Sequence, residues 1–188
     1  VTAPTSQPWA RFGAALDLVP GRDSPLAGML VGSPGDNELG PLAGAGWVFA
    51  ADGTGGVDAV PETKLTTAGG QAWDLAGSSV VGLDSEGEED EGVSVLILGA
   101  PGWRDPISGL VSGAAIIFTP DHEQSEGDEE DGPQGDDGYW FHDITISGDA
   151  IEGAAGHSIA IDISTVQAWD TDVVSIWVGA PGSSSGQG

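Results

Sequence analysis

The chain has 188 residues, in which 30 Asp and Glu outnumber four Lys and Arg, so its formal net charge is -26. A field of this sign repels polyanions, so we expect neither nucleic acid nor an anionic lipid surface as a partner. No stretch approaches the ~20 apolar residues of a membrane span, which predicts no membrane insertion, and the lack of Cys excludes disulfides and a thiol nucleophile.

In chain order, the sequence predicts three copies of one β unit. Each copy opens with a small-residue step, after which a short apolar strand runs into a turn. The steps contain Gly13, Gly77 and Gly156, and the turns are Gly32-Ser33-Pro34-Gly35, Gly99-Ala100-Pro101-Gly102 and Gly179-Ala180-Pro181-Gly182. Gly lets two backbones approach closely and Pro has no N–H for a ladder, so we predict that each strand ends at its turn.

Two further strands follow in each of the first two units. In the first unit they are predicted over 45–50 and 63–67, and in the second over 112–119 and 141–147. Residues 93–98 are apolar at nearly every position, which indicates a strand covered on both faces. Four short strands separated by Gly, Pro and acidic loops are typical of a propeller blade.

The predicted fold is therefore all-β, a partial β-propeller of about two and a half four-stranded antiparallel blades. Residues 1–8 are expected to form the last strand of a preceding blade, and 9–68 the first blade. Residues 69–148 are expected to form the second blade, with an acidic insertion at 121–138, and 149–188 the first half of a third.

These paired steps and turns resemble the FG-GAP repeat of integrin alpha-chain propellers and their microbial relatives, over nearly the whole chain. The resemblance implies that the chain is part of a larger propeller of about seven blades. The positions that match the motif are Phe12, Gly13, Gly32, Pro34, Gly77, Gly99, Pro101, Gly156, Gly179 and Pro181.

The resemblance also implies calcium, because the family often carries an Asp-rich or Asn-rich calcium loop before the Gly-Ala-Pro strand. The best match in this chain is the second unit, with the candidate ligands Asp84, Glu86, Glu89 and Glu91, and a weaker pair in the third unit is Asp170 and Asp172. Gly87 and Val95 stand where the family has acidic ligands, so the match is partial. Calcium requires ~6 to 8 oxygen ligands around one point.

The sequence gives only weak signals of catalysis. No Ser lies in a Gly-x-Ser-x-Gly turn between strand and helix, no phosphate-binding loop is present, and the three His lack the spacing of paired metal ligands. We therefore expect a protein that is not an enzyme.

Tryptophans supply the candidate contact residues. Trp47 and Trp177 lie within apolar strands and are predicted to pack in the core. Trp73, Trp103 and Trp169 fall in or beside loops, where they could face a ligand or a neighbouring subunit. Trp103 precedes Arg104 and Asp105, which predicts either a contact site or a self-contained stacking motif.

The expected function is that of a non-catalytic extracellular or cell-surface module for binding or adhesion, whose blade-end loops contact a protein or a glycan. One alternative is a structural subunit of a surface layer or extracellular filament, which would bind copies of itself. A second alternative is the accessory propeller of a secreted hydrolase.

Overall fold

The computed structural model describes the backbone of most of the first 120 residues and three later strands. The described residues are 1–4, 7–19, 28–84, 94–120, 140–147, 158–166 and 171–179. Within them, side chains are described at 1–4, 7–19, 28–82, 95–119 and 178–179.

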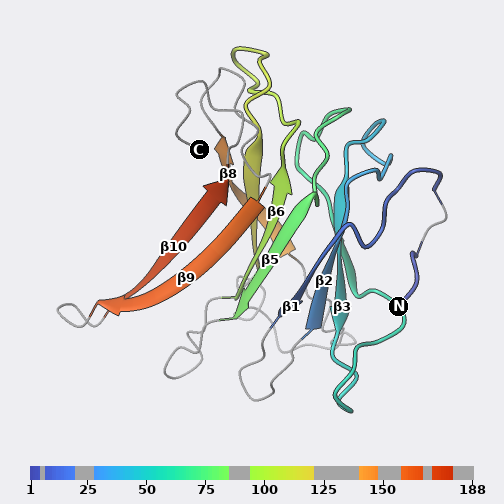
Figure 1. The fold of residues 1–188 in the computed structure, drawn as a ribbon, viewed down its shortest axis with the longest axis vertical. Helices are drawn as coiled ribbons and strands as arrows, with labels where there is room; N and C mark the ends of the chain where they lie inside the picture. Colours follow the sequence, from blue (N-terminus) through green and yellow to red (C-terminus); the bar gives the residue numbers. More distant parts are fainter. Residues whose placement is uncertain are drawn as a thin grey trace, which may run out of the picture.

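The described part of the chain is all-β, with ten strands and no helix (Figure 1). The strands are β1 Ala15–Val19, β2 Gly28–Ser33, β3 Ala45–Ala50, β4 Thr63–Leu65, β5 Ser79–Asp84, β6 Ser94–Ala100, β7 Ala114–Pro120, β8 Trp140–Ser147, β9 Ser158–Val166 and β10 Thr171–Gly179. They form three antiparallel sheets: sheet 1 in the order β1-β2-β3-β4, sheet 2 in the order β5-β6-β7-β8, and sheet 3 from β9 and β10. The prediction of an all-β chain with four antiparallel strands in each of two units is confirmed.

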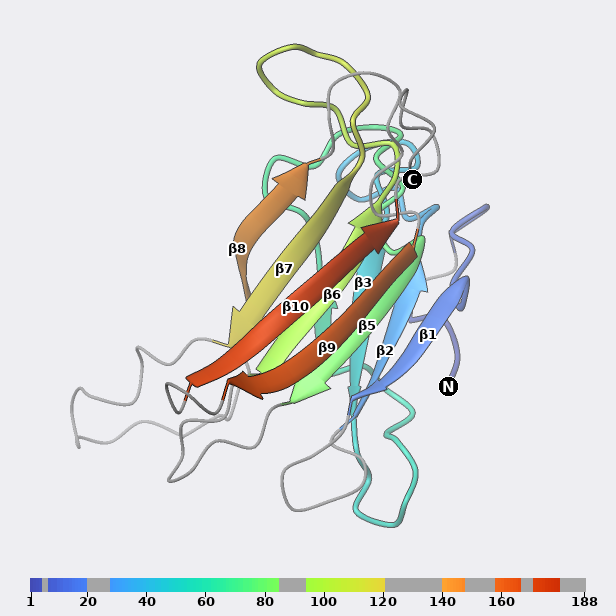
Figure 2. The same cartoon turned by 60° about the vertical axis from the view of Figure 1, so that its left-hand side comes forward.

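The sheets stack on one another (Figure 2), and buried apolar side chains fill the contacts between them. Val19, Leu30 and Val48 of sheet 1 belong to one buried cluster with Leu96, Leu98 and other residues of sheet 2. The opposite face of sheet 2 packs against Val178 of β10. β6 is therefore covered on both faces, and its residues Val95 to Ala100 are all buried, as the continuous apolar run predicted.

The two four-stranded sheets are built in the same register. Ala15 of β1 lies opposite Gly32 of β2, and Ser79 of β5 lies opposite Gly99 of β6. Counting from these pairs makes the loop 7–13 equivalent to the loop 71–77, and we call the two loops the opening loops. β2 ends at Ser33 and β6 at Ala100, each directly before the Pro of its turn.

Each turn is closed onto its own opening loop by backbone hydrogen bonds. The N–H of Gly35 donates to the carbonyl of Ala10 at 2.9 Å, and the N–H of Gly102 donates to Asp74 at 3.0 Å. No side chain fits at these glycines, because a Cβ on Gly102 would lie 1.8 Å from the carbonyl oxygen of Trp73. The second Gly of the turn is thus required by close backbone approach.

A short parallel pairing joins sheet 1 to sheet 2. The N–H groups of Trp73, Leu75 and Ala76 donate to the carbonyls of Pro41, Leu42 and Ala43 at 2.9, 3.0 and 3.0 Å. Gly44 and Ala76 form a parallel bridge at its end. We call this pairing of 41–44 with 73–76 the loop ladder. It fixes the second opening loop to the sheet that precedes it.

A side chain reinforces the contact between the two sheets. The Asp17 carboxylate of β1 accepts a hydrogen bond from the N–H of Gly82 in β5 at 2.9 Å. Gly82 lies on the edge strand of sheet 2, so the carboxylate satisfies a donor that an edge strand leaves open.

One sequence expectation differs from the structure: the strand expected over 63–67 is shorter, since β4 ends at Leu65. Residues 1–8 were expected to be the last strand of a preceding blade. The described residues 1–4 and 7–8 pair with no described strand, and a strand needs a neighbour to pair with, so this expectation stays a prediction. Gly156 and Pro181 lie outside the described residues, and the boundaries of the units stay predictions.

The close approach at Gly102 generates a stability prediction. Gly102→Ala would push its Cβ against the carbonyl of Trp73, so the loop ladder must shift, and we expect a loss of about 2–3 kcal/mol in the free energy of unfolding. Gly53→Asn is the control, because Gly53 has φ +71° and open space around it. Asn tolerates that backbone, so we expect a loss of no more than about 0.5 kcal/mol. Equal losses in urea denaturation would contradict this explanation of the turn.

Candidate binding site at the turn end of the sheets

Two tryptophans occupy equivalent positions in the opening loops and extend into solvent. Trp9 is 84% exposed and Trp73 is 59% exposed. Both have a left-handed backbone, with φ of 69° and 77°. Such a conformation costs a residue other than Gly ~1–2 kcal/mol, so the surrounding hydrogen bonds must enforce it.

The strained conformation is repeated along the whole opening loop. Arg11 and Leu75 follow at φ of 55° and 58°, and Gly13 and Gly77 at 85° and 84°. Backbone strain of this kind concentrates at sites that hold ligands. Two exposed indoles in the same enforced conformation are therefore the strongest candidate for a binding site.

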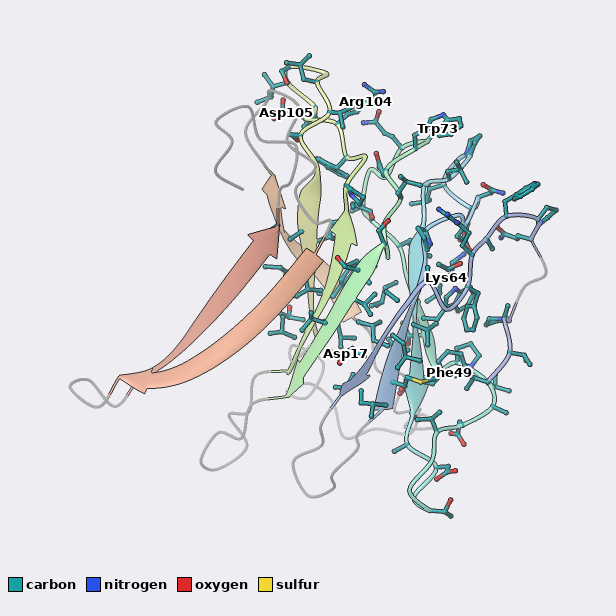
Figure 3. All side chains as sticks on the ribbon, in the orientation of Figure 1. Asp17, Phe49, Lys64, Trp73, Arg104 and Asp105 are labelled. Carbon is teal, nitrogen blue, oxygen red and sulfur yellow. The ribbon has the colours of Figure 1, made fainter. Side chains whose placement is uncertain are left out.

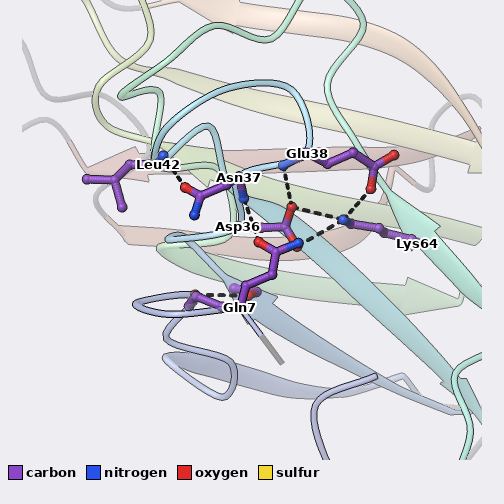
Figure 4. Close-up of polar contacts among 8 residues, drawn as sticks. Gln7, Asp36, Asn37, Glu38, Leu42 and Lys64 are labelled. Atoms are coloured by element: carbon purple, nitrogen blue, oxygen red, sulfur yellow. Dashed lines mark hydrogen bonds and ion pairs between the residues drawn. The ribbon is translucent and has the colours of Figure 1, made fainter. Parts of the chain in front are cut away.

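The loop that follows β2 carries one side of the loop ladder and is organised by a buried ion pair. Asp36 is 2% exposed, and both of its carboxylate oxygens accept hydrogen bonds from Lys64 Nζ at 2.9 Å. Lys64 also pairs with Glu38 (Figure 4), and its ammonium lies 4.8 Å from the centre of the Trp47 ring. Because burying a charged carboxylate is costly without an opposite charge beside it, the ion pair with Lys64 fixes Asp36 and with it the start of this loop.

Asn37 connects the same loop to the first opening loop. Its side-chain Oδ1 accepts a hydrogen bond from the N–H of Leu42 at 2.8 Å, and its own N–H donates to Gln7 Oε1 at 2.8 Å (Figure 4). Between these two loops lies a pocket of about 490 Å³ that is open to solvent. Its lining residues are Pro8, Trp9, Arg11, Asn37, Pro41 and Leu42. This volume lies within the range of small-molecule sites.

Trp103, which was expected among the contact residues, is buried in the structure. It is 8% exposed and belongs to the cluster between sheets 1 and 2. Its N–H donates to the carbonyl of Ala100 at 3.1 Å, and its own carbonyl accepts from Ser112 and Gly113. These bonds turn the indole inward, where apolar burial is favourable.

Arg104, unlike Trp103, is exposed at the end of the sheets that carries the Gly-Pro turns, as is Trp73, whereas Asp105 beside it is half-buried (Figure 3). Arg104 Nη1 donates to the carbonyl of Gly109 at 3.4 Å. Asp105 accepts hydrogen bonds from the N–H groups of Ser108 and Ile107, which lower the pKa of its carboxyl. These bonds give the loop after Arg104 a defined shape.

Asp74 is a buried carboxyl beside the exposed Trp73. It is 1% exposed, and burial raises its pKa, while the N–H of Gln71 and the nearby charge of Arg104 act in the opposite direction. Its Oδ2 accepts the hydrogen bond from Gln71, whereas Oδ1 has no partner among the described residues. The Asp74 carboxyl therefore holds the second opening loop through its bond to Gln71, although burial disfavours its charged form.

The candidate calcium ligands are only partly described. The backbone places Asp84 at the end of β5, opposite Ser94, and Asp172 near the start of β10, opposite Thr165. Both positions are at the end of the sheets that faces away from Trp73 and Arg104 (Figures 1 and 3). Glu86, Glu89, Glu91, Asp170 and the candidate contact residue Trp169 lie outside the described residues. Within the described residues, no three His, Asp or Glu side chains gather as a metal site.

Comparison with known proteins adds no relative. No protein-family model matches the chain, and no curated protein matches it. Among the described residues, no helix has the length and apolar character needed to cross a membrane.

Sequence reasoning missed Trp9 and Arg11 as site residues. The available signal was their spacing: Trp9 stands four residues before Gly13, as Trp73 stands four residues before Gly77. Arg11 corresponds to Leu75, so the charge is particular to the first opening loop.

The raised pKa of Asp74 predicts a pH dependence of stability. Between the ordinary value of 3.8 and the higher folded pKa, the folded state binds more protons than the unfolded state. The stability contributed by this group therefore falls as pH rises through that window. We expect the melting temperature of the wild type, relative to Asp74→Asn, to decrease from pH 3.8 upward and then to level off. A difference that increases with pH would mean that the attraction of Arg104 outweighs burial.

Proposed function

We propose that the chain is a non-catalytic binding or adhesion module of the FG-GAP propeller type that acts outside the cell or at its surface. The observation that carries the proposal is the pair of exposed tryptophans, Trp9 and Trp73, held in equivalent left-handed positions at one end of the sheets. A protein or glycan ligand would contact them.

Ligand binding explains the tryptophans better than folding does. An indole that is mostly in solvent adds little to the core, and its left-handed backbone costs stability. Exposed Trp side chains are rigid, present both apolar and polar surface, and are enriched among residues that dominate binding energy. Two such side chains in one protein therefore favour a contact role.

The propeller part of the proposal rests on the repeated stacking of the sheets. Sheet 2 packs on sheet 1, and sheet 3 packs on sheet 2, while sheets 1 and 2 share one register and one turn geometry. A further sheet could add to sheet 1 by the same contacts. Calcium at Asp84, Glu86, Glu89 and Glu91 stays a prediction of the family resemblance.

The contact role of the tryptophans can be tested on a glycan array and a panel of extracellular-matrix proteins. We expect the wild type to bind at least one probe, and Trp9→Asn with Trp73→Asn to weaken that binding at least tenfold, because Asn accepts the left-handed backbone but lacks the indole. Val60→Asn is the control, since Val60 is exposed and lies in the connection between β3 and β4, at the other end of these strands. Binding that is unaffected by the double substitution would refute the proposed site.

A structural subunit is a second candidate, favoured by a different observation. The N–H groups of Trp9, Arg11 and Phe12 correspond to the three donors of the loop ladder, yet they have no partner among the described residues. In strand β1 of sheet 1, the side chains of Leu16 and Leu18 are each 56% exposed. They correspond in register to Val80 and Gly82, which face sheet 1. This surface would suit another unit of the same kind.

Self-association tests this second candidate. If copies of the chain assemble through sheet 1, sedimentation velocity at increasing concentration should show oligomers. Leu16→Lys with Leu18→Lys should return the chain to a monomer, because the charges would have to be buried in the contact. A wild type that stays monomeric across the concentration series would eliminate the structural subunit and leave the binding module.

A further inference from the structure

We propose that the pocket beside Trp9 binds a sugar that carries a carboxylate, with Trp9 under the sugar ring and Arg11 on the acid group. This inference rests on the proposed binding function and assigns a ligand class to one of its sites. Its basis is that the pocket carries a positive charge in a strongly acidic chain and that several of its lining residues have a left-handed backbone.

Among the described residues that line the pocket, Arg11 alone is charged. The chain has four Lys and Arg against 30 acids, yet the ion pairs among the described residues involve Lys64 and not the Arg11 guanidinium. Lys64, in contrast, is held by Asp36 and Glu38. A guanidinium is a planar donor with a strong preference for carboxylates, so Arg11 selects an anionic group on a ligand.

The other polar group at the pocket is also a donor. The Oδ1 of Asn37 is occupied by the N–H of Leu42, whereas its Nδ2 has no partner among the described residues. The side chains therefore offer hydrogen-bond donors from Arg11 and Asn37, and the remaining lining is apolar: Pro8, Trp9, Pro41 and Leu42. A ligand that fits has an apolar face, acceptor oxygens and a negative charge. A sugar acid combines these three properties.

The pocket also concentrates the backbone strain of the described residues. Five described residues other than Gly have positive φ, and Trp9, Arg11 and Leu42 are among the pocket's lining. Strain of this kind preorganises a site, because the side chains are held before the ligand arrives. The pocket of about 490 Å³ is large enough for one or two sugar rings.

The net charge of -26 restricts the ligand to few charges. Long-range repulsion grows with the charge of the ligand, so a polyanion is disfavoured while a single carboxylate in contact with Arg11 is tolerated. In 0.5 M NaCl the screening length is roughly 4 Å, which removes most of the repulsion but spares a direct contact. Binding should therefore be measured at that salt concentration.

The experiment is a titration of the ¹⁵N-labelled chain with sodium glucuronate, glucose and sodium acetate, followed on the indole N–H signals. The Trp9 signal is identified by its absence from Trp9→Asn. We expect glucuronate to shift it with saturation, and glucose and acetate to bind at least tenfold more weakly, because each lacks one of the two recognised features.

Arg11→Leu is the decisive variant, because Leu75 occupies the equivalent position with nearly the same φ, so the loop should keep its conformation. We expect it to weaken glucuronate at least tenfold, and Arg11→Lys to weaken it less, since the charge remains while the planar fork is lost. The Trp73 signal serves as an internal control and should not move.

Each result other than the expected one contradicts a specific part of the proposal. Equal binding of glucose would eliminate the carboxylate, and equal binding of acetate would eliminate the ring. No shift at Trp9, in a protein that still binds a probe on the array through Trp9, would refute the sugar acid but retain the binding module. No shift at Trp9 and no array binding that depends on Trp9 and Trp73 would refute both.

Discussion

The loop ladder between 41–44 and 73–76 is the interaction on which the arrangement of the two four-stranded sheets depends. Each sheet could form alone from its hairpins, since antiparallel neighbours need only short connections. Three backbone hydrogen bonds of 2.9 to 3.0 Å then set where the second sheet begins relative to the first. The apolar cluster between the sheets is non-directional, so it supplies stability but not this register.

The ladder does not by itself set the conformation of the second opening loop. Trp73 and Leu75 are left-handed and donate their backbone N–H groups to the preceding sheet. The first opening loop has the same conformation, but its equivalent N–H groups have no partner among the described residues. Its bonds from Gly13 to Gly32 and from Gly35 to Ala10 therefore hold it in place from within the unit.

The residue after the second Gly of the turn is buried in both units, but its side chain is stabilised differently in each. Asp36 and Trp103 both follow the second Gly of the turn, and both donate their N–H to the last residue of the preceding strand, Ser33 or Ala100. Trp103 satisfies burial by apolar packing, whereas Asp36 needs Lys64 as a partner. Lys64 rests over Trp47, so the pair is integrated into the outer face of sheet 1.

The strands were predictable from sequence because their signals are local. An apolar run that ends in Gly, a small residue, Pro and Gly predicts the ends of β2 and β6 without any tertiary information. Trp103 was not predictable in this way, because its burial depends on a loop that folds back between two sheets. Trp9 and Arg11 were missed because a left-handed backbone at residues other than Gly contradicts local preference, and only the neighbouring bonds enforce it.

Native-state hydrogen exchange tests the role of the loop ladder most directly. The amides of Trp73, Leu75 and Ala76 should exchange at least tenfold more slowly, after correction for intrinsic rates, than those of Trp9, Arg11 and Phe12. The two loops are equivalent, and among the described residues only Trp73, Leu75 and Ala76 donate to a neighbouring sheet. Equal exchange of the two sets at the unprotected rate would contradict the ladder as the link between the sheets.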